Sequence, residues 1–356
     1  MSSLFSDSPF RVFFGGPDRP PGLLCNLLRE RIRAVPSGGE IFWATYYLRN
    51  EALGQALVDA KRRGANVRLT LEAAPRTGSA NHGLLQVLRE PDRLGRDIRG
   101  LSHRWPDNLR LKKPRLHIKL YYFSHPAPHV LVGTFNPSGN RSEDPSIIEE
   151  LGDQDRGHNV LVEVTDPTLV AALRRHVRLL HAGGHGPWER LLIRNNRVIE
   201  SGDTRMYFFP RLARNVIARL FSTLGTGTVL RIAVSHLNER NMVHTLVRLA
   251  ERRIRIEIIT HDTQRRVPPW VEGQLLGGGE VTFCRYRHPE GLPMHNKFIL
   301  IDAPQGRQVL FGSMNLSKHS LNANHELLVV SRNPSLYAAF AERWVQMVQE
   351  LQEMGA

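Results

Sequence analysis

Two stretches decide the fold, Ile41-Phe-Trp-Ala-Thr-Tyr-Tyr-Leu48 and Leu230-Arg-Ile-Ala-Val-Ser-His-Leu237. Each is short, apolar and rich in aromatic or β-branched residues, which predicts a buried strand. After the first stretch, Asn50 is a candidate helix cap, and apolar residues then recur at helical spacing until Gly64. The segment 67–71 predicts the next strand, so the pattern is strand, helix, strand.

The same pattern returns in the second half of the chain without a gap. The matched pairs are Leu57 with Leu246, Arg63 with Arg252, and Val67 with Ile256. Because a run of matched positions is hard to reach by chance, the chain is predicted to be an internal duplication. Strands that alternate with helices predict an α/β fold, made of two fused, pseudo-symmetric α/β/α sandwich halves with mixed sheets. The boundary is expected in the turn-rich stretch 183–187, which gives halves 1–187 and 188–356.

Composition limits the class of protein. The chain has 356 residues, 41% of them hydrophobic, so a soluble protein with a substantial core is expected. Its net charge of +14 favours a polyanionic partner, either nucleic acid or an anionic membrane. Cys25 and Cys284 form neither a disulfide framework nor a zinc motif. We therefore expect no metal and no other cofactor, and the histidines at 176, 181 and 185 fit no metal template.

No secretory leader and no run of about 18 apolar residues is visible in the sequence. The expectation is a cytoplasmic protein without a transmembrane segment, peripheral to the inner face of the membrane.

A polar pattern occurs once in each half. The first half contains His117-Ile-Lys119 followed by Gly133-Thr-Phe-Asn136, and the second contains His295-Asn-Lys297 followed, at nearly the same separation, by Gly312-Ser-Met-Asn315. On a strand, residues two apart project from the same face, so each His and Lys are expected side by side. The turn can offer a hydroxyl, an amide and backbone N–H groups to phosphate oxygens. An HxK on a strand is usually a solvated edge, but the joint, repeated occurrence favours a functional site.

At these residues the chain resembles the phospholipase D superfamily, whose signature is HxK, a later aspartate, and GSxN. The complete pattern is present in the second half: His295, Lys297, Asp302, Gly312, Ser313 and Asn315, followed by Glu326 in the place of a supporting glutamate. The resemblance implies a fold of two such halves and a metal-independent phosphodiester enzyme.

The first half departs from this pattern. Ser124 stands at the aspartate position, Asn159 at the glutamate position, and Thr134 replaces the motif serine. The resemblance implies that the aspartate supports structure more than chemistry, so its loss leaves activity possible.

The expected mechanism uses two histidines at one shared active site. One attacks phosphorus to give a phosphohistidine, and the other protonates the leaving oxygen. A carboxylate beside a histidine favours the imidazolium, so His295 near Glu326 is the candidate acid and His117 near Asn159 the candidate nucleophile. The groups expected to stabilise the developing charge are Lys119, Lys297, Asn136 and Asn315.

Three functions remain open. The first is a phospholipase D or a phosphatidyl transferase resembling cardiolipin synthase, acting on anionic phospholipid at a membrane surface. The second is a nuclease of the same superfamily, and the third a degenerate phosphate-binding protein without turnover. The acidic segment 141–156 is either a lid or a simple insertion, and its charge argues mildly against a long polyanion. The arginine pairs 62–63, 252–253 and 265–266 are expected mostly on solvated faces, with one of them a candidate to guide an anion.

Overall fold

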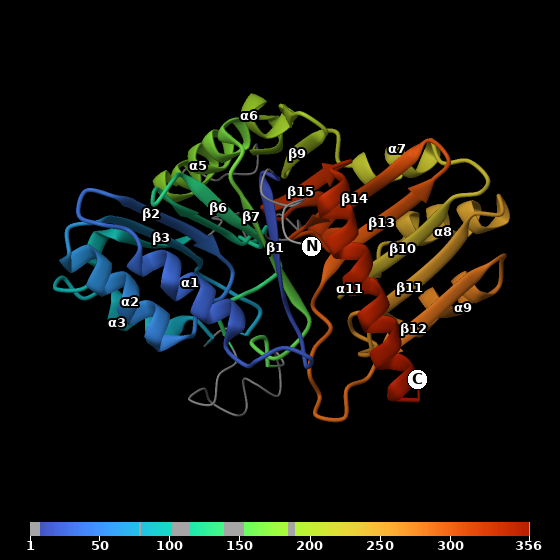
Figure 1. Ribbon diagram of the computed structural model, residues 1–356, viewed down its shortest axis with the longest axis horizontal. Coiled ribbons are helices and arrows are strands. Elements are labelled where there is room, and N and C mark those ends of the chain that lie inside the picture. The colour runs from blue at the N-terminus through green and yellow to red at the C-terminus, as the bar shows by residue number, and fades with distance from the viewer. Residues whose placement is uncertain (1–7, 78–79, 102–113, 139–152, 184–188, 356) are drawn as a thin grey trace, which may run out of the picture. The chain divides into compact units, whose positions relative to one another are not determined.

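The computed structural model describes residues 8–77, 80–101, 114–138, 153–183 and 189–355. The chain forms two compact units, Pro9–Glu189 and Arg190–Ala356, blue to green and yellow to red in Figure 1. Each unit contains one mixed β-sheet with helices on both faces, which confirms the predicted α/β/α halves.

The sheet of the first unit has the strand order β1-β7-β6-β5-β2-β3-β4. Its strands are β1 (Phe10–Gly15), β2 (Glu40–Thr45), β3 (Asn66–Glu72), β4 (Ile98–Leu101), β5 (Leu120–Phe123), β6 (His129–Gly133) and β7 (Asn159–Val164). Strands β2, β3 and β4 run parallel, and the other neighbours are antiparallel. The helices are α1 (Leu23–Arg33), α2 (Glu51–Arg62), α3 (His82–Leu88) and α5 (Pro167–Ala182), with a 3-10 turn η1 (Gly95–Asp97). Helix α5 packs on β2 and its neighbours, while α1, α2 and α3 pack together (Figure 1).

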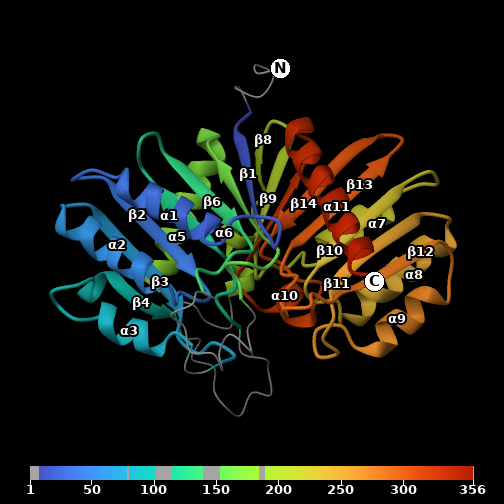
Figure 2. The ribbon, with the colours of Figure 1, turned by 60° about the horizontal axis from the view of Figure 1, so that its bottom comes forward.

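The second sheet has the order β12-β11-β10-β13-β14-β15-β9-β8. Its strands are β8 (Ile199–Ser201), β9 (Thr204–Phe209), β10 (Val229–Val234), β11 (Arg255–His261), β12 (Val281–Tyr286), β13 (Lys297–Ala303), β14 (Gly306–Gly312) and β15 (Glu326–Ser331). The helices are α6 (Ile193–Asn196), α7 (Val216–Ser222), α8 (Arg240–Glu251), α9 (Pro269–Leu276), α10 (Lys318–Asn322) and α11 (Pro334–Glu353), with a 3-10 turn η2 (Glu189–Leu191). Helix α11 lies along β13 and β14, and α8 and α9 cover the other face (Figure 2).

The two sheets have the same topology. Read from the parallel edge, β4-β3-β2-β5-β6-β7-β1 corresponds strand by strand to β12-β11-β10-β13-β14-β15-β9, and β8 is added at the end of the second sheet. The strands β2 and β10, the helices α2 and α8, and the strands β3 and β11 begin at equivalent positions of the two copies, as the repeat predicted. The duplication is therefore confirmed in three dimensions.

The helix starts repeat as well as the helices. Asn50 Oδ1 accepts a hydrogen bond from Leu53 N over 3.0 Å, and Glu239 Oε2 accepts one from Met242 N over 2.7 Å, at the equivalent place. Each bond satisfies one backbone N–H that a helix start leaves without a partner, and such a cap stabilises a helix by about 1 kcal/mol. Two different residue types thus give the same local structure.

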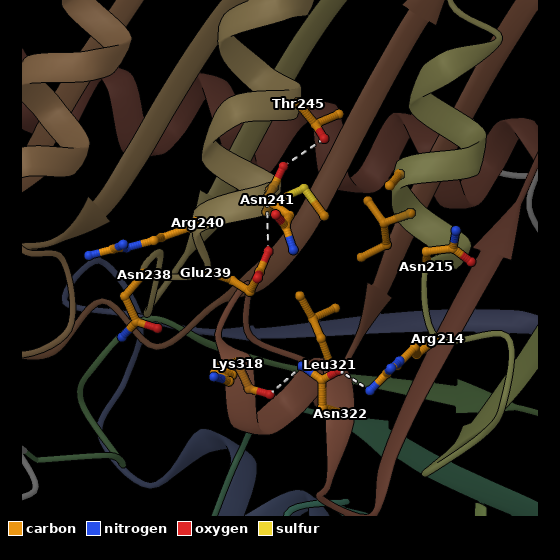
Figure 3. A pocket seen from close by; sticks show the side chains of 13 residues that line it. Arg214, Asn215, Asn238, Glu239, Arg240, Asn241, Thr245, Lys318, Leu321 and Asn322 are labelled. Carbon is orange, nitrogen blue, oxygen red and sulfur yellow. Dashed lines mark hydrogen bonds between the residues drawn. The ribbon is translucent and has the colours of Figure 1, made fainter.

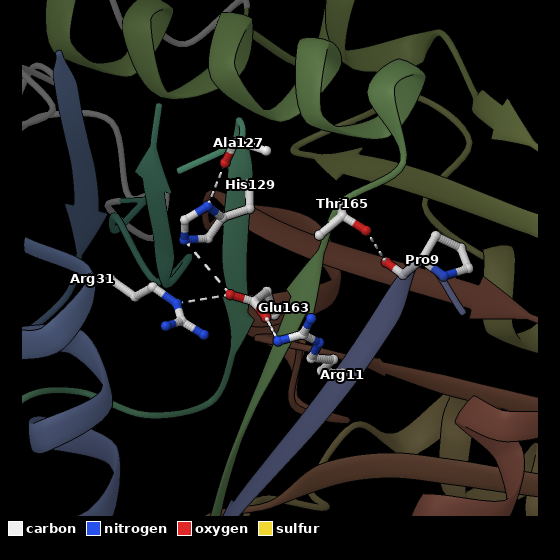
Figure 4. A network of polar contacts seen from close by, with 7 residues as sticks. All are labelled: Pro9, Arg11, Arg31, Ala127, His129, Glu163 and Thr165. Carbon is white, nitrogen blue, oxygen red and sulfur yellow. Dashed lines mark hydrogen bonds and ion pairs between the residues drawn. The ribbon is translucent and has the colours of Figure 1, made fainter. Parts of the chain in front are cut away.

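A buried carboxylate links four elements of the first unit. Glu163 on β7 accepts a hydrogen bond from Arg31 on α1 over 2.9 Å, and Arg11 on β1 lies 3.7 Å away. His129 Nε2 on β6 is 3.6 Å from the same carboxylate, while Nδ1 donates to the Ala127 carbonyl. Burial lowers the pKa of His129, so the neutral ring is favoured. Figure 4 shows Arg31 and Arg11 reaching Glu163 from different elements, which compensates the burial of its charge.

Candidate functional site

In the second half, the motif lysine is buried against the motif histidine. Lys297 is 3% exposed and its Nζ donates a hydrogen bond to the backbone carbonyl of His295 over 2.7 Å. Strand β13 begins at Lys297, opposite Val234 at the end of β10, so His295 precedes the strand. The prediction that both residues lie on the strand is therefore corrected, because the paired region of β10 ends there.

The first half repeats this arrangement. Lys119 is fully buried, and its Nζ donates to the backbone carbonyl of His117 over 2.5 Å. Strand β5 starts one residue later, at Leu120. In both halves a buried ammonium group is thus held two residues after a histidine, at the start of a strand or directly before it. A charged amine is costly to bury, so its retention in both copies points to a function for the charge.

The Gly-Ser/Thr turns depend on a close backbone approach. A Cβ atom at Gly133 would lie 2.1 Å from the Val160 carbonyl oxygen, and one at Gly312 would lie 2.1 Å from the Leu327 carbonyl oxygen. Gly312 also has a φ of +146°, a region that side chains rarely adopt. Glycine is therefore required for the turn to contact β7 or β15.

The hydroxyl after each glycine makes the same two backbone contacts. Ser313 N donates to Leu327 O over 3.1 Å, and Leu327 N donates to Ser313 Oγ over 3.1 Å. Thr134 and Val160 exchange the equivalent hydrogen bonds, both over 2.9 Å. The replacement of serine by threonine in the first half leaves this framework intact.

The hydroxyls also bind the residues at the supporting position. Ser313 Oγ donates to Glu326 Oε2 over 2.5 Å, and Thr134 Oγ1 donates to Asn159 Oδ1 over 3.1 Å. Both acceptors are fully buried. Asn159 uses its amide nitrogen to donate to Gln154 O over 2.9 Å, a bond that a carboxylate could not make. The exchange of Glu for Asn thus removes a charge but keeps a complete set of local bonds.

The motif asparagines are buried at the ends of these turns. Asn136 is 2% exposed and its Oδ1 accepts a hydrogen bond from Tyr47 N over 3.4 Å. Asn315 is 4% exposed, and its Oδ1 has no hydrogen-bond partner among the residues that the structure describes. Buried polar atoms are nearly always paired, so this amide is suited to bind a group that enters the site.

The motif aspartate lies elsewhere. Asp302 is near the far end of β13, five residues from Lys297, which corresponds to about 17 Å along a strand. Its Oδ1 is 3.2 Å from Arg307 Nε. Ser124, the equivalent residue, accepts a hydrogen bond from Glu40 N over 2.7 Å. Asp302 and Ser124 are therefore not placed with the other motif residues of their halves.

Sequence reasoning missed two residues that surround the first motif. The Tyr46 ring lies edge-on to His117, with 5.4 Å between ring centroids, and Lys119 Nζ is 5.5 Å from the Tyr46 centroid. The Tyr46 hydroxyl accepts a hydrogen bond from Arg115 over 3.0 Å. The buried carboxylate of Glu72 accepts one from Leu116 N over 2.6 Å, and burial raises its pKa. Neither residue is repeated at the equivalent position of the second half, so comparison of the two halves did not reveal it.

The second half has different side chains at these two positions, Ser235 and His261. Burial, followed by the nearby Arg266, Arg265 and Lys297 cations, lowers the pKa of His261 to about 2. Arg266 is 7% exposed and donates to Ser235 Oγ over 3.3 Å. The expectation that Arg266 is on a solvated face is therefore wrong. Its loop turns back onto the end of β10, where Leu237 N donates to Arg266 O over 3.2 Å.

A second matched pair was also missed. His158 and His325 directly precede Asn159 and Glu326, and both are buried, at 0% and 1% exposure. Comparison of the two halves of the sequence could have found this pair, because a histidine stands at the same position in both.

A pocket of about 660 Å³ opens beside the second motif. The backbone N–H groups of Asn238 and Glu239 donate to Leu316 O, directly after Asn315, and so hold the start of α8 against the turn. The pocket is lined by Arg214, Asn215, Ile217, Ala218, Asn238, Glu239, Arg240, Asn241, Met242, Thr245, Lys318, Leu321 and Asn322. In Figure 3, Arg240 and Lys318 extend to one side, and Arg214 reaches Asn322, to which it donates over 2.9 Å. The lining suits an anionic or polar group.

Most of the acidic segment expected to be a lid or an insertion lies outside the described residues. The acidic segment 141–156 is described only from Asp153 onward, where burial raises the pKa of Asp155. Within the described ranges, no helix is long and apolar enough to cross a membrane. In the same ranges, no group of three or more His, Cys, Asp or Glu side chains is placed to hold a metal ion.

The chain is similar to known proteins in sequence and fold. Residues 225–348 match the family model described as cardiolipin synthase, PLD-like domain. A mitochondrial cardiolipin hydrolase from Chlamydomonas reinhardtii is 27% identical over 160 residues, which cover 44% of this chain and 68% of the relative. Phosphatidylserine synthase from Haemophilus influenzae shares the fold with a TM-score of 0.61 and 13% identity, over 95% of this chain and 86% of that one. Polyphosphate kinase from Porphyromonas gingivalis has a TM-score of 0.62 and 15% identity, over 94% of this chain and 49% of the kinase, so the chain spans about half its length.

The fold and the family match together define the class of protein, a duplicated α/β protein of the phospholipase D type. Residues 225–348, in the second half of the chain, match a domain of the phospholipase D superfamily.

Proposed function

We propose that the protein is a phosphodiester enzyme that forms a phosphohistidine and acts on the head groups of anionic phospholipids. The observation that carries the proposal is the repeated unit of histidine, buried lysine and glycine-hydroxyl turn in both halves. A protein fold does not require two buried lysines at equivalent positions, whereas a phosphoryl group with developing negative charge does use fixed cations.

In the proposed reaction, the two motif histidines act on one phosphodiester. His117 attacks phosphorus, a new N–P bond forms, and the P–O bond to the leaving alcohol breaks. His295 donates its proton to that alcohol oxygen. His295 then removes a proton from water or from a second alcohol, which attacks phosphorus and frees His117. Water gives hydrolysis, and an alcohol gives transfer of the phosphatidyl group.

The asymmetry between the halves supports this division of roles. The supporting position holds a buried carboxylate, Glu326, in the second half and a neutral amide, Asn159, in the first. A nearby negative charge favours a protonated histidine. The second half therefore favours the general acid, and the first half the nucleophile.

Phospholipid is the favoured substrate because the matched family model and the C. reinhardtii relative are both named for cardiolipin chemistry. The pocket beside Asn315 supports an anionic substrate, since Arg214, Arg240 and Lys318 contribute to its lining. A nuclease is the second candidate, because the net charge of +14 would also attract nucleic acid.

The deciding experiment is a parallel assay on phosphatidylglycerol vesicles and on DNA, each with and without a chelator. We expect turnover of lipid alone, unaffected by chelator, with phosphatidate as the product of hydrolysis or cardiolipin as the product of transfer. His117→Ala and His295→Ala should each lower the rate at least 1000-fold, on the order expected for loss of a nucleophile or general acid. His244→Ala, on the exposed side of α8, is the matched control.

Cleavage of DNA without lipid turnover would replace the proposal with the nuclease function. Absence of turnover on both substrates and on a chromogenic phosphodiester would indicate a binding protein. A phosphoryl adduct trapped on His295 and absent from His117 would reverse the two histidine roles.

A further inference from the structure

A basic groove in the first unit is lined by none of the motif residues. It has a volume of about 950 Å³ and runs between α5 and the strands that α5 covers. It is lined by Arg68, Tyr122, Ala127, Pro128, Thr165, Pro167, Val170, Ala171, Arg174, Arg175, Arg178, Leu179 and Ala182. Four arginines thus share one groove that has no part in the proposed reaction.

Most of this positive charge is not compensated locally. Arg174 binds the Glu40 carboxylate through two hydrogen bonds of 2.7 and 2.8 Å. Arg68, Arg175 and Arg178 make no hydrogen bond or ion pair with the residues that the structure describes. The groove therefore presents a net positive charge, and Arg175 and Arg178 are exposed on α5.

The rest of the lining is mainly apolar. Val170 and Leu179 come from α5, Pro128 from the turn before β6, and Tyr122 from β5. Arginines on an apolar wall suit a ligand with a negative head and a hydrocarbon body, because the long arginine stems lie on apolar surface while their charges reach water. A nucleic-acid backbone would use the charges and leave the apolar wall without a partner.

The second half provides an internal control for the role of these arginines. Helices α5 and α11 start alike: Asp166 and Asn333 cap them, and a proline follows each cap. When residues are counted from these caps, Arg175 on α5 corresponds to Glu342 on α11, and Arg178 corresponds to Val345.

The other two arginines are also absent from the second half. Arg174 corresponds to Ala341, and Arg68 on β3 corresponds to Glu257 on β11. Glu257 forms an ion pair with Arg231 over 3.1 Å. The same fold therefore exists without any of the four cations, so packing does not require them.

We propose that the α5 groove docks the protein on the surface of a membrane rich in anionic phospholipid. The phosphate groups of the lipids contact Arg68, Arg175 and Arg178, and the apolar wall faces the outermost part of the acyl chains. This site binds lipid that is not turned over. No motif residue lines it, and the proposal stands whether or not the protein hydrolyses lipid.

The test is sedimentation with vesicles. The double variant Arg175→Gln, Arg178→Gln removes two charges and keeps good helix formers at exposed positions. Each cation near an anionic surface contributes about 1 kcal/mol, or about fivefold, to binding, so the variant should bind phosphatidylcholine vesicles with 30% phosphatidylglycerol about 30-fold more weakly. The matched control, Arg219→Gln, Arg248→Gln, removes two exposed arginines from α7 and α8 and should bind nearly as the unchanged protein does.

Three results would overturn the proposal. One is an equal loss of binding in the control variant, which would indicate attraction by net charge alone. Another is equal binding of the unchanged protein to pure phosphatidylcholine vesicles. The third is a loss of duplex DNA binding in the α5 variant with vesicle binding unchanged, which would make the groove a nucleic-acid site.

Turnover of a soluble chromogenic diester separates docking from catalysis. The α5 variant should keep its full rate on that diester while it loses vesicle binding. If lipid turnover is absent in every variant but the 30-fold difference in binding remains, the proposed function fails and the docking site stands.

Discussion

The hydroxyl of Ser313 donates a hydrogen bond of 2.5 Å to the buried carboxylate of Glu326. At the equivalent place in the first half, Thr134 donates to the neutral Asn159 over 3.1 Å. Both hydroxyls also accept one backbone N–H, from Leu327 or Val160. The two halves therefore differ at this point mainly in the charge of the acceptor.

This difference predicts unequal costs for removing the hydroxyl. Ser313→Ala should lower the free energy of unfolding by about 3 kcal/mol, because a buried carboxylate and a backbone N–H both lose a partner. Thr134→Ala should cost about 1 kcal/mol less, since the amide acceptor is neutral. Urea unfolding at pH 7 measures both values. A larger loss for Thr134→Ala would show that the carboxylate is not held by this hydroxyl.

The glycine that precedes each hydroxyl gives a second prediction. Gly312→Ala places a Cβ 2.1 Å from the Leu327 carbonyl oxygen and also strains the backbone at a φ of +146°. We expect a loss of at least about 3 kcal/mol in the free energy of unfolding, or failure to fold, because both partners are backbone atoms in a sheet. Gly133→Ala should behave similarly, with a clash of the same distance at Val160.

Gly273 is the control for this pair. It lies within α9, and a Cβ there would meet no atom within 4 Å. Gly273→Ala should therefore leave stability unchanged or raise it by about 0.5 to 1 kcal/mol. A Gly312→Ala protein with ordinary stability would show that the turn can move away from β15.

The sequence predicted those parts of the fold and the site whose spacing is the same in both halves. The constant spacing of the repeat located β2, α2 and β3 and their copies, because helix caps and apolar periodicity persist where residue types change, as at Asn50 and Glu239. Ser124 and Asn159 were correctly matched to Asp302 and Glu326, since strand pairing fixes their registers.

Tyr46 and Glu72 could not be found in this way. Their counterparts in the second half, Ser235 and His261, are chemically different. Comparison of the two halves therefore shows no repeated residue at these positions. Arg266 was misplaced for another reason. An arginine pair usually indicates a solvated face, and only the return of its loop to Leu237 buries it.

The buried lysines give a third prediction, about catalysis. If Lys297 stabilises negative charge on the phosphoryl oxygens, Lys297→Met should lower kcat about 100- to 1000-fold with a smaller change in KM. Lys119→Met should do the same, because its ammonium has the same bond to a motif-histidine carbonyl. The control is Arg248→Met, which removes an exposed cation from α8 that lines no part of the pocket. Rates would be measured on a soluble chromogenic diester at saturating concentration. Unchanged kcat in a folded Lys297→Met protein would remove this lysine from the mechanism.

His261 gives a prediction about pH. Burial and the Arg266, Arg265 and Lys297 cations lower its pKa to about 2, whereas an unfolded histidine titrates near 6.5. The Asp262 carboxylate, 3.0 Å from Nδ1, opposes this shift, but its side chain is 37% exposed and its charge is screened by water. A histidine whose pKa is depressed on folding contributes stability that is fully present above pH 6.5. That stability is lost as the pH falls from 6.5 towards the folded pKa, because only the unfolded chain takes up the proton.

In the unchanged protein, His261 should therefore lower the free energy of unfolding by about 1.4 kcal/mol for each pH unit below 6.5. His261→Asn keeps an acceptor for the Thr263 N–H, which now donates to Nδ1 over 3.3 Å, and removes the titration. Between pH 7 and pH 5 the variant should lose about 2 kcal/mol less than the unchanged protein in urea unfolding. His244→Asn on α8 controls for the loss of an imidazole. Parallel pH profiles for His261→Asn and the unchanged protein would mean that His261 can take up its proton in the folded state, and that the cations around Lys297 do not hold it neutral.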